Sequence, residues 1–283
     1  MDYSTPTEVV SALVDTGARK ATMPVTDLLI RGALSGALLA VSTTLAITAA
    51  AQSGAAIVGA IVFPVGFVMI VLLGLELITG NFALMPMAQM ARRAGVRGVL
   101  HNWTWVFVGN LLGSILYGIL FAATLTMMFS EPATGIAARI VALAEAKTLA
   151  YAAHGGSGFI TAFVKAMLCN WLVCMGVVMA AVARSTVSKV LAAWLPVTTF
   201  FGLGFEHTVV NMFLIPTGMM LGAKISVADW VLWNMVPVTL GNLVGGFVFT
   251  GLALYGTYAL RAGAPRDDAR PGAALGTTPA GPN

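Results

Sequence analysis

Two ionisable residues stand side by side inside an apolar run of the chain. Glu206 and His207 lie in the segment 191–223, where hydrocarbon side chains predominate. Ionisable groups are costly at membrane depth unless they face a cavity or a partner, so this pair is a candidate functional site. A protonated imidazole would attract an anion and could pass it a proton. The alternative interpretation is a buried histidine whose hydrogen bonds are satisfied by backbone carbonyls.

The first half of the chain holds a similar pattern. Glu76 lies in a second long apolar run, 56–91, and we expect Glu76 and Glu206 to accept backbone N–H bonds within interrupted helices. His207 has no counterpart there, because Leu77 follows Glu76, so we place the chemistry at His207. The matching motifs are Gly74-x-Glu76 with Gly204-x-Glu206, and Gly109-Asn110-Leu111-Leu112-Gly113 with Gly241-Asn242-Leu243-Val244-Gly245.

The composition is that of an integral membrane protein. Charged residues make up 9% of the chain, hydrophobic residues make up 58%, and the mean hydropathy is +0.90. A soluble domain is about a quarter charged, which excludes that class. The net charge of +4 does not indicate a nucleic-acid partner, because the basic residues occupy short connections between apolar runs. No metal-binding, haem, flavin or nucleophile motif is present, so we expect no cofactor and no enzymatic activity.

The elements that must position these residues are six predicted transmembrane helices in an all-α fold. We expect the second helix to be broken between Glu76 and Pro86 and the fifth between Gly202 and Pro216, since glycine and proline disrupt helices. Two halves of three helices each would be inverted relative to one another, which is typical of transport proteins whose broken helices meet at the midplane. The predicted spans are 27–51, 56–91, 101–129, 158–183, 191–223 and 227–260.

Charge and composition divide the chain into three regions. Residues 1–26 form an N-terminal segment with an amphipathic helix over 5–20, residues 27–262 form the transport domain, and residues 263–283 form a disordered tail. Residues 130–156 are the longest polar connection. Lys and Arg gather on the side of both termini, which predicts that both are cytoplasmic in the inner (plasma) membrane of a prokaryote.

The sequence resembles the formate/nitrite transporter family over about residues 25–260. The most specific stretches are Gly204-Phe205-Glu206-His207 continuing into Asn211-Met212-Phe213-Leu214-Ile215-Pro216, Asn170-Trp171-Leu172-Val173-Cys174, and Pro237-Val238-Thr239-Leu240-Gly241-Asn242-Leu243-Val244-Gly245-Gly246.

The resemblance implies a homopentamer of aquaporin-like protomers, each with its own pore around His207. It implies that Thr79 hydrogen-bonds His207, that Asn170 lies near the pore centre, and that Lys147, or else Lys165, attracts anions in the outer vestibule. It groups Phe63, Phe67 and Phe200 at the outer constriction and slit, and Ile78 and Val173 at the inner constriction. Glu76, Asn110, Asn211 and Asn242 are expected to be structural.

The function implied is passage of formate together with protons across the lipid bilayer. Nitrite, hydrosulfide and short carboxylates are alternative substrates within the same family. A different class, an aquaporin-like channel for neutral solutes, shares two broken helices in inverted halves. The paired Asn-Pro-Ala motifs of that class are absent, because neither Asn81 nor Asn211 precedes a proline.

Overall fold

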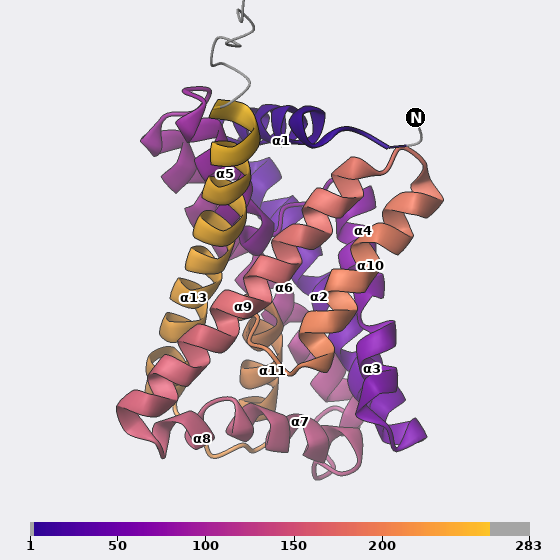
Figure 1. Ribbon diagram of the computed structural model, residues 1–283. Helices are drawn as coiled ribbons and strands as arrows, with labels where there is room; N and C mark the ends of the chain where they lie inside the picture. Colours follow the sequence, from indigo (N-terminus) through magenta and orange to yellow (C-terminus); the bar gives the residue numbers. More distant parts are fainter. Residues whose placement is uncertain (1–2, 261–283) are drawn as a thin grey trace, which may run out of the picture.

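A computed structural model describes residues 3–260, and the predicted tail over 263–283 lies outside this range. The described chain is built from helices that run between two ends of the molecule (Figure 1). Helix α1 (Pro6–Lys20) lies across one end, and α7 (Ile136–Ala146) and α8 (Leu149–Ala152) lie across the other. The polar connection over 130–156 is therefore largely helical.

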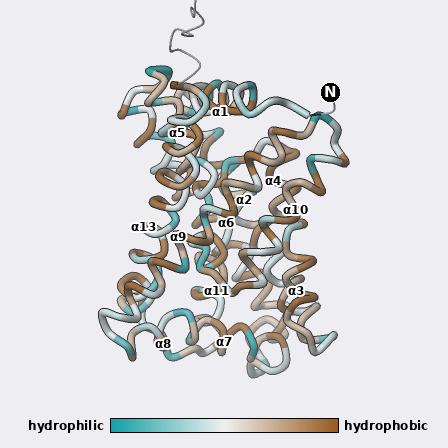
Figure 2. The backbone as a smooth tube through the Cα atoms, viewed as in Figure 1, coloured by the Kyte–Doolittle hydropathy of each residue, from teal (hydrophilic) through white to brown (hydrophobic). Residues whose placement is uncertain are grey.

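Four helices within the described residues are long and apolar enough to cross a membrane. They are α2 (Val25–Ser53), α6 (Val96–Leu125), α9 (Gly155–Val182) and the segment Val227–Ala259. The last segment joins α12 (Val227–Trp230) and α13 (Val236–Gly246) with π-helical turns. Large apolar side chains on these helices, such as Leu34 and Leu116, are exposed. Hydrophobic residues recur along the length of the bundle (Figure 2). The exposed apolar side chains suit contact with lipid or with other subunits.

Two further segments are interrupted. The first consists of α3 (Ala56–Val62), α4 (Pro64–Leu72) and α5 (Ile78–Met90), and the second of α10 (Thr186–Gly202) and α11 (Thr208–Met220). The breaks cover residues 73–77 and 203–207.

Glycine, and not proline, produces both breaks. Gly74 and Gly204 have φ of 62° and 65°, a left-handed conformation that glycine adopts at little cost. The predicted role of the prolines was wrong, because Pro86 and Pro216 lie inside α5 and α11. Each helix tolerates its proline since the surrounding helices bury this part of the chain.

Helix α1 has the amphipathic character that its sequence predicted. Its buried side chains, Val9, Leu13 and Val14, pack against a cluster that includes Leu84 and Met87 of α5. Exposed charges add an ion pair between Arg93 Nη1 and Asp15 Oδ1 at 2.8 Å. The C-terminal end of α1 thereby places Lys20 beside the first helix break.

Candidate functional site

The two helix breaks meet in the interior of the molecule. Leu77 and His207 are the N-cap residues of α5 and α11, and both have extended backbones. The Thr79 hydroxyl lies 3.2 Å from His207 Nε2, and this contact joins the first turns of the two helices. The side chain of His207 is buried, with 2% of its surface exposed. The amides of these first turns have no intrahelical acceptor and carry the positive ends of both helix dipoles.

Two buried asparagines hold the breaks with the same set of hydrogen bonds. Asn110 Oδ1 accepts from Ile78 N at 2.9 Å, and its Nδ2 donates to the carbonyls of Gly32 at 2.8 Å and Glu76 at 2.9 Å. Asn242 Oδ1 accepts from Thr208 N at 2.8 Å. Its Nδ2 donates to the carbonyls of Ala166 at 2.7 Å and Glu206 at 3.0 Å. Each asparagine therefore joins two long helices to one half-helix.

Lys20 and Glu76 form a buried ion pair beside the first break. Lys20 Nζ lies 2.7 Å from Glu76 Oε1, and only 1% of the glutamate side chain is exposed. Asn81 Nδ2 donates to Glu76 Oε2 at 2.8 Å and to Asn102 Oδ1 at 2.9 Å. Asn102 Nδ2 donates in turn to the Lys20 carbonyl at 3.3 Å, which closes the network onto the end of α1.

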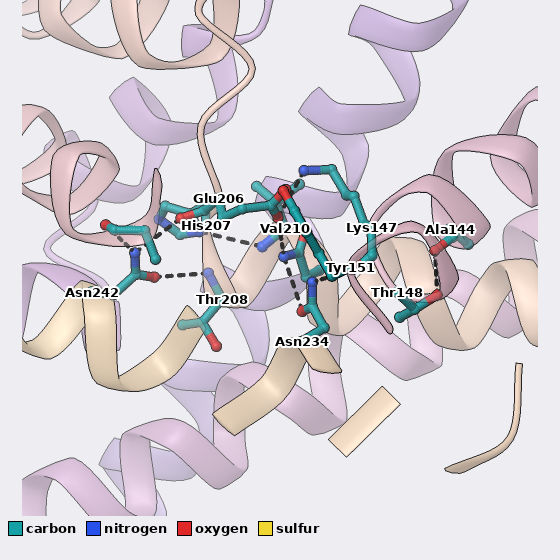
Figure 3. A network of polar contacts seen from close by, with 12 residues as sticks. Ala144, Lys147, Thr148, Tyr151, Glu206, His207, Thr208, Val210, Asn234 and Asn242 are labelled. Carbon is teal, nitrogen blue, oxygen red and sulfur yellow. Dashed lines mark hydrogen bonds and ion pairs between the residues drawn. The ribbon is translucent and has the colours of Figure 1, made fainter. Parts of the chain in front are cut away.

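A matching network surrounds Glu206 at the second break (Figure 3). Lys147 Nζ lies 2.9 Å from Glu206 Oε2, and Asn211 Nδ2 donates to the same oxygen at 2.8 Å. Asn211 Nδ2 also donates to Asn234 Oδ1 at 3.0 Å, and Asn234 Nδ2 donates to the Lys147 carbonyl at 2.8 Å.

Tyr151 adds a contact that the first network does not have among the described residues. Its hydroxyl donates to Glu206 Oε1 at 2.8 Å. Burial, together with the adjacent Glu206 carboxylate, raises the pKa of Tyr151, so the phenol keeps its proton and remains a donor. Glu206 is thus held by three donors, Lys147, Tyr151 and Asn211.

These networks correct one prediction and add residues that it missed. Both carboxylates bind side-chain donors, whereas we predicted backbone N–H groups; the asparagine clamps hold the backbone instead. A signal for the missed lysine was present in the spacing. Lys20 precedes Glu76 by 56 residues, and Lys147 precedes Glu206 by 59. The unpredicted residues are Lys20, Asn102, Tyr151 and Asn234.

Of the two lysines suggested for the vestibule, the structure joins only Lys147 to Glu206. Lys165 instead lies over the ring of Tyr151, with Nζ 5.9 Å from the ring centroid. A cation above an aromatic ring is attracted to its electron-rich face, so Lys165 stabilises the position of Tyr151, which donates to Glu206.

Asn170 links the second asparagine clamp to the first half of the chain. Its Nδ2 donates to the carbonyls of Thr79 at 3.0 Å and Asn242 at 2.7 Å. The Cys174 thiol, one helical turn further, lies 3.4 Å from the same Thr79 carbonyl. Thr79 is therefore fixed through its carbonyl, while its hydroxyl contacts His207.

The five residues predicted to form constrictions belong to one buried apolar cluster. The Phe200 ring stacks on the His207 imidazole, with centroids 5.7 Å apart and planes at 19°. Phe63 contacts Phe200 edge to face at 5.6 Å. The cluster includes Phe63, Phe67, Ile78, Val173 and Phe200.

Two cavities approach this cluster from opposite sides. One, of about 280 Å³, is lined by Lys20, Glu76 and Phe67, among others. The other, of about 520 Å³, is lined by Lys147, Phe200 and His207, among others. We call them the Lys20 cavity and the Lys147 cavity. Phe67 thus borders the Lys20 cavity, whereas the resemblance grouped it with Phe200. Within residues 3–260, no group of three or more His, Cys, Asp or Glu side chains could hold a metal ion.

Comparison with known proteins identifies relatives along almost the whole chain. Residues 7–256 match the model of the family described as formate/nitrite transporter. The chain is 32% identical over 266 residues to the uncharacterized transporter YrhG of Bacillus subtilis, covering 91% of this chain and 95% of the relative. It is 30% identical over 264 residues to the formate channel BtFdhC of Bacillus thuringiensis, covering 91% of this chain and 97% of that channel.

Solved structures show the same likeness. One, described as an FNT family ion channel, superposes with a TM-score of 0.77 at 25% identity and covers 89% of this chain and 99% of that chain. Another, described as a pentameric formate channel with formate bound, has a TM-score of 0.66 at 28% identity. The match covers 83% of this chain and 98% of that chain.

Proposed function

The chain belongs to the formate/nitrite transporter family, and we propose that it moves formate, or a similar small monovalent anion, across the membrane. The observation that carries this proposal is the pair of cavities on either side of the Thr79–His207 contact, each bordered by a lysine. An apolar cluster lies between them. Such an arrangement attracts an anion at each end and excludes water from the middle.

We further propose six membrane crossings in two inverted halves, with both termini in the cytoplasm. The matched asparagine clamps and lysine–glutamate networks support this architecture, because two related halves would repeat their internal contacts. The likeness to a pentameric channel supports a homopentamer of aquaporin-like protomers, each holding its own pore.

The hydrogen bonds of His207 support a donor role for its imidazole. Nδ1 accepts from Val210 N at 3.3 Å (Figure 3), and because a backbone amide can only donate, Nδ1 carries no proton. The proton of the neutral ring therefore sits on Nε2 and points to the Thr79 hydroxyl. Thr79 is then free to donate its own hydroxyl proton to an anion at the centre.

Transfer of a proton from His207 to the anion would require the neutral imidazole to become protonated first. An imidazolium carries protons on both nitrogens, so its formation would break the bond from Val210 N. A bound anion offsets that loss by pairing with the positive ring. Protonation of formate at this point would allow the neutral acid to pass Phe200, Ile78 and Val173, because an apolar constriction opposes an unpaired charge far more strongly.

The buried glutamates serve this scheme by fixing the lysines. Each lysine ammonium contacts a carboxylate that further donors hold, so the cation stays at the cavity wall. The positive ends of α5 and α11 add to the attraction for an anion between them.

Flux assays on proteoliposomes test the proposal. We expect rapid formate uptake, competition by nitrite, and no light-scattering change with glycerol beyond that of empty liposomes. Passage of glycerol with exclusion of formate would instead identify a neutral solute channel. Nitrite uptake without formate uptake would identify nitrite, the alternative substrate within the same family, as the transported anion.

A further inference from the structure

The Lys147 cavity has a second cation, Arg139, in addition to Lys147. Arg139 and Lys147 both line this cavity, and no Asp or Glu is among its described lining residues. Lys147 is paired with Glu206 at 2.9 Å, whereas none of the ion pairs found within residues 3–260 includes Arg139. The side chain of Arg139 is exposed.

Helix α7 fixes where Arg139 stands. Its residues Ala137, Ile140 and Ala144 are buried against the bundle. Arg139, Leu143 and Lys147, spaced four residues apart, border the cavity on the other side. At a rise of 1.5 Å per residue, the Cα atom of Arg139 lies roughly 12 Å along the helix from that of Lys147. The Arg139 side chain is exposed, whereas that of Lys147 is only 20% exposed and contacts the buried Glu206, so the guanidinium stands nearer to solvent and the ammonium stands deeper.

The two cations contribute differently to the electrostatic potential of the cavity. A lysine paired with a carboxylate acts at a distance as a dipole, whose potential falls off faster than that of a single charge. The potential that an approaching anion meets is then set mainly by the uncompensated Arg139. Resting on the function proposed above, we infer that Arg139 is the anion-capture residue of the Lys147 cavity. Lys147 receives the anion only after Arg139 has drawn it in.

The Lys20 cavity offers a comparison on the opposite side. Arg19 lines it, and its Nη2 donates to the Thr16 hydroxyl at 2.9 Å. Arg31, which also lines it, lies 3.6 Å from Asp27. Arg19 is in none of the ion pairs found among the described residues. Arg19→Gln should therefore weaken capture from its own side and leave capture at the Lys147 cavity unchanged.

Sided initial-rate measurements test the inference. Formate entry is measured in spheroplasts and in inverted vesicles from the same cells, which present opposite faces of the protein. For Arg139→Gln, entry from the Lys147 side should show a KM about threefold higher at low salt, with an unchanged maximal rate. The difference should disappear near 0.5 M salt, where the Debye length is roughly 4 Å. Entry from the Lys20 side should be that of the wild type.

Two matched variants separate capture from other effects. Arg139→Lys keeps the charge and should restore the wild-type KM. Lys224→Gln removes one exposed positive charge at the same end of the molecule, where the Lys224 amide donates to Glu145 Oε1, but Lys224 does not line the cavity. It should leave KM unchanged.

The outcomes distinguish this inference from the proposed function. If wild-type protein carries neither formate nor nitrite, the proposed function fails. If wild-type protein carries formate while Arg139→Gln matches it in KM and in salt dependence, the capture role is overturned and the function stands. An equal rise of KM from both sides would also overturn it, because that pattern indicates a general structural change.

Discussion

At the residue scale, the site depends on charges that are balanced before any anion arrives. Glu76 and Glu206 are almost completely buried, and each contacts one lysine. A buried carboxylate without a partner would be strongly unfavourable, so the pair fixes both the loop and the lysine that borders the cavity. His207, in contrast, is in none of the ion pairs found among the described residues, and its ring hydrogen-bonds Thr79 and Val210 N. The charge of His207 can therefore change without breaking an ion pair.

Removal of one member of the buried pair should destabilise the protein. Lys147→Met leaves the Glu206 charge uncompensated and should lower the free energy of unfolding by roughly 3–5 kcal/mol. The double variant Lys147→Met/Glu206→Gln should recover part of this loss, because no buried charge remains. Denaturation in mild detergent measures both.

The exposed pair Arg93–Asp15 provides the control for that series. Both side chains are about half exposed, at 56% and 44%, so Arg93→Gln should cost less than roughly 1 kcal/mol. Equal losses for Lys147→Met and Arg93→Gln would mean that burial of the Glu206 network contributes nothing.

At the element scale, close helix contacts position the two asparagine clamps. A Cβ at Gly113 would lie 1.8 Å from the Ala33 carbonyl oxygen, and one at Gly245 would lie 2.1 Å from that of Met167. Gly113 follows Asn110 on α6, and Gly245 follows Asn242 on α13, so the same close approach that glycine permits brings each clamp to its half-helix.

Alanine at either glycine should disturb the clamp beside it. Gly113→Ala forces α2 and α6 apart, and we expect a loss of stability of roughly 1–3 kcal/mol together with slower formate flux. Gly156→Ala is the control, since nothing lies within 4 Å of its Cβ position in α9. Thermal unfolding of the purified variants gives the comparison. A Gly113→Ala protein as stable as Gly156→Ala would show that this contact does not fix the helices.

The sequence predicted the helix breaks well, because the residue types that mark them have few other roles inside an apolar segment. An ionisable pair in an apolar run, the glycines before each glutamate and the repeated Gly-Asn-Leu-x-Gly motifs predicted the breaks and their place in the chain. Proline misled, because Pro86 and Pro216 lie inside helices that the surrounding helices bury, and sequence alone does not reveal this setting.

Lys20 was missed for a related reason. A lysine at the end of an amphipathic helix has the same local sequence whether it faces solvent or a buried carboxylate. Its partner, Glu76, is 56 residues away, and only the packing of α1 on α5 brings the two together. Tyr151 is similar, since its contact with Glu206 depends on how α8 packs at the end of the bundle.

At the scale of the whole molecule, each protomer contains both cavities and the centre between them. The proposed pentamer would then hold five independent paths instead of one shared axial path. Exposed apolar side chains on the long helices, such as Leu34 and Leu116, leave ample surface for contacts between subunits and with lipid.

Mixed assemblies test that independence. Wild-type subunits and subunits blocked by Val173→Trp are co-expressed with different tags, and pentamers of known ratio are purified. Because each path lies within one subunit, formate flux should fall in proportion to the fraction of blocked subunits. A much steeper fall would indicate a path that the subunits share.

The most direct test of the account is formate flux against pH for His207→Asn beside the wild type. Asparagine is also a good N-cap and keeps an N–H donor, but it does not titrate, so the fold and the path should survive. We expect the wild-type rate to rise on acidification, because His207 must take up a proton before it can pass one to the anion, and the variant to lack this rise. Superimposable curves for the two proteins would contradict the role of His207.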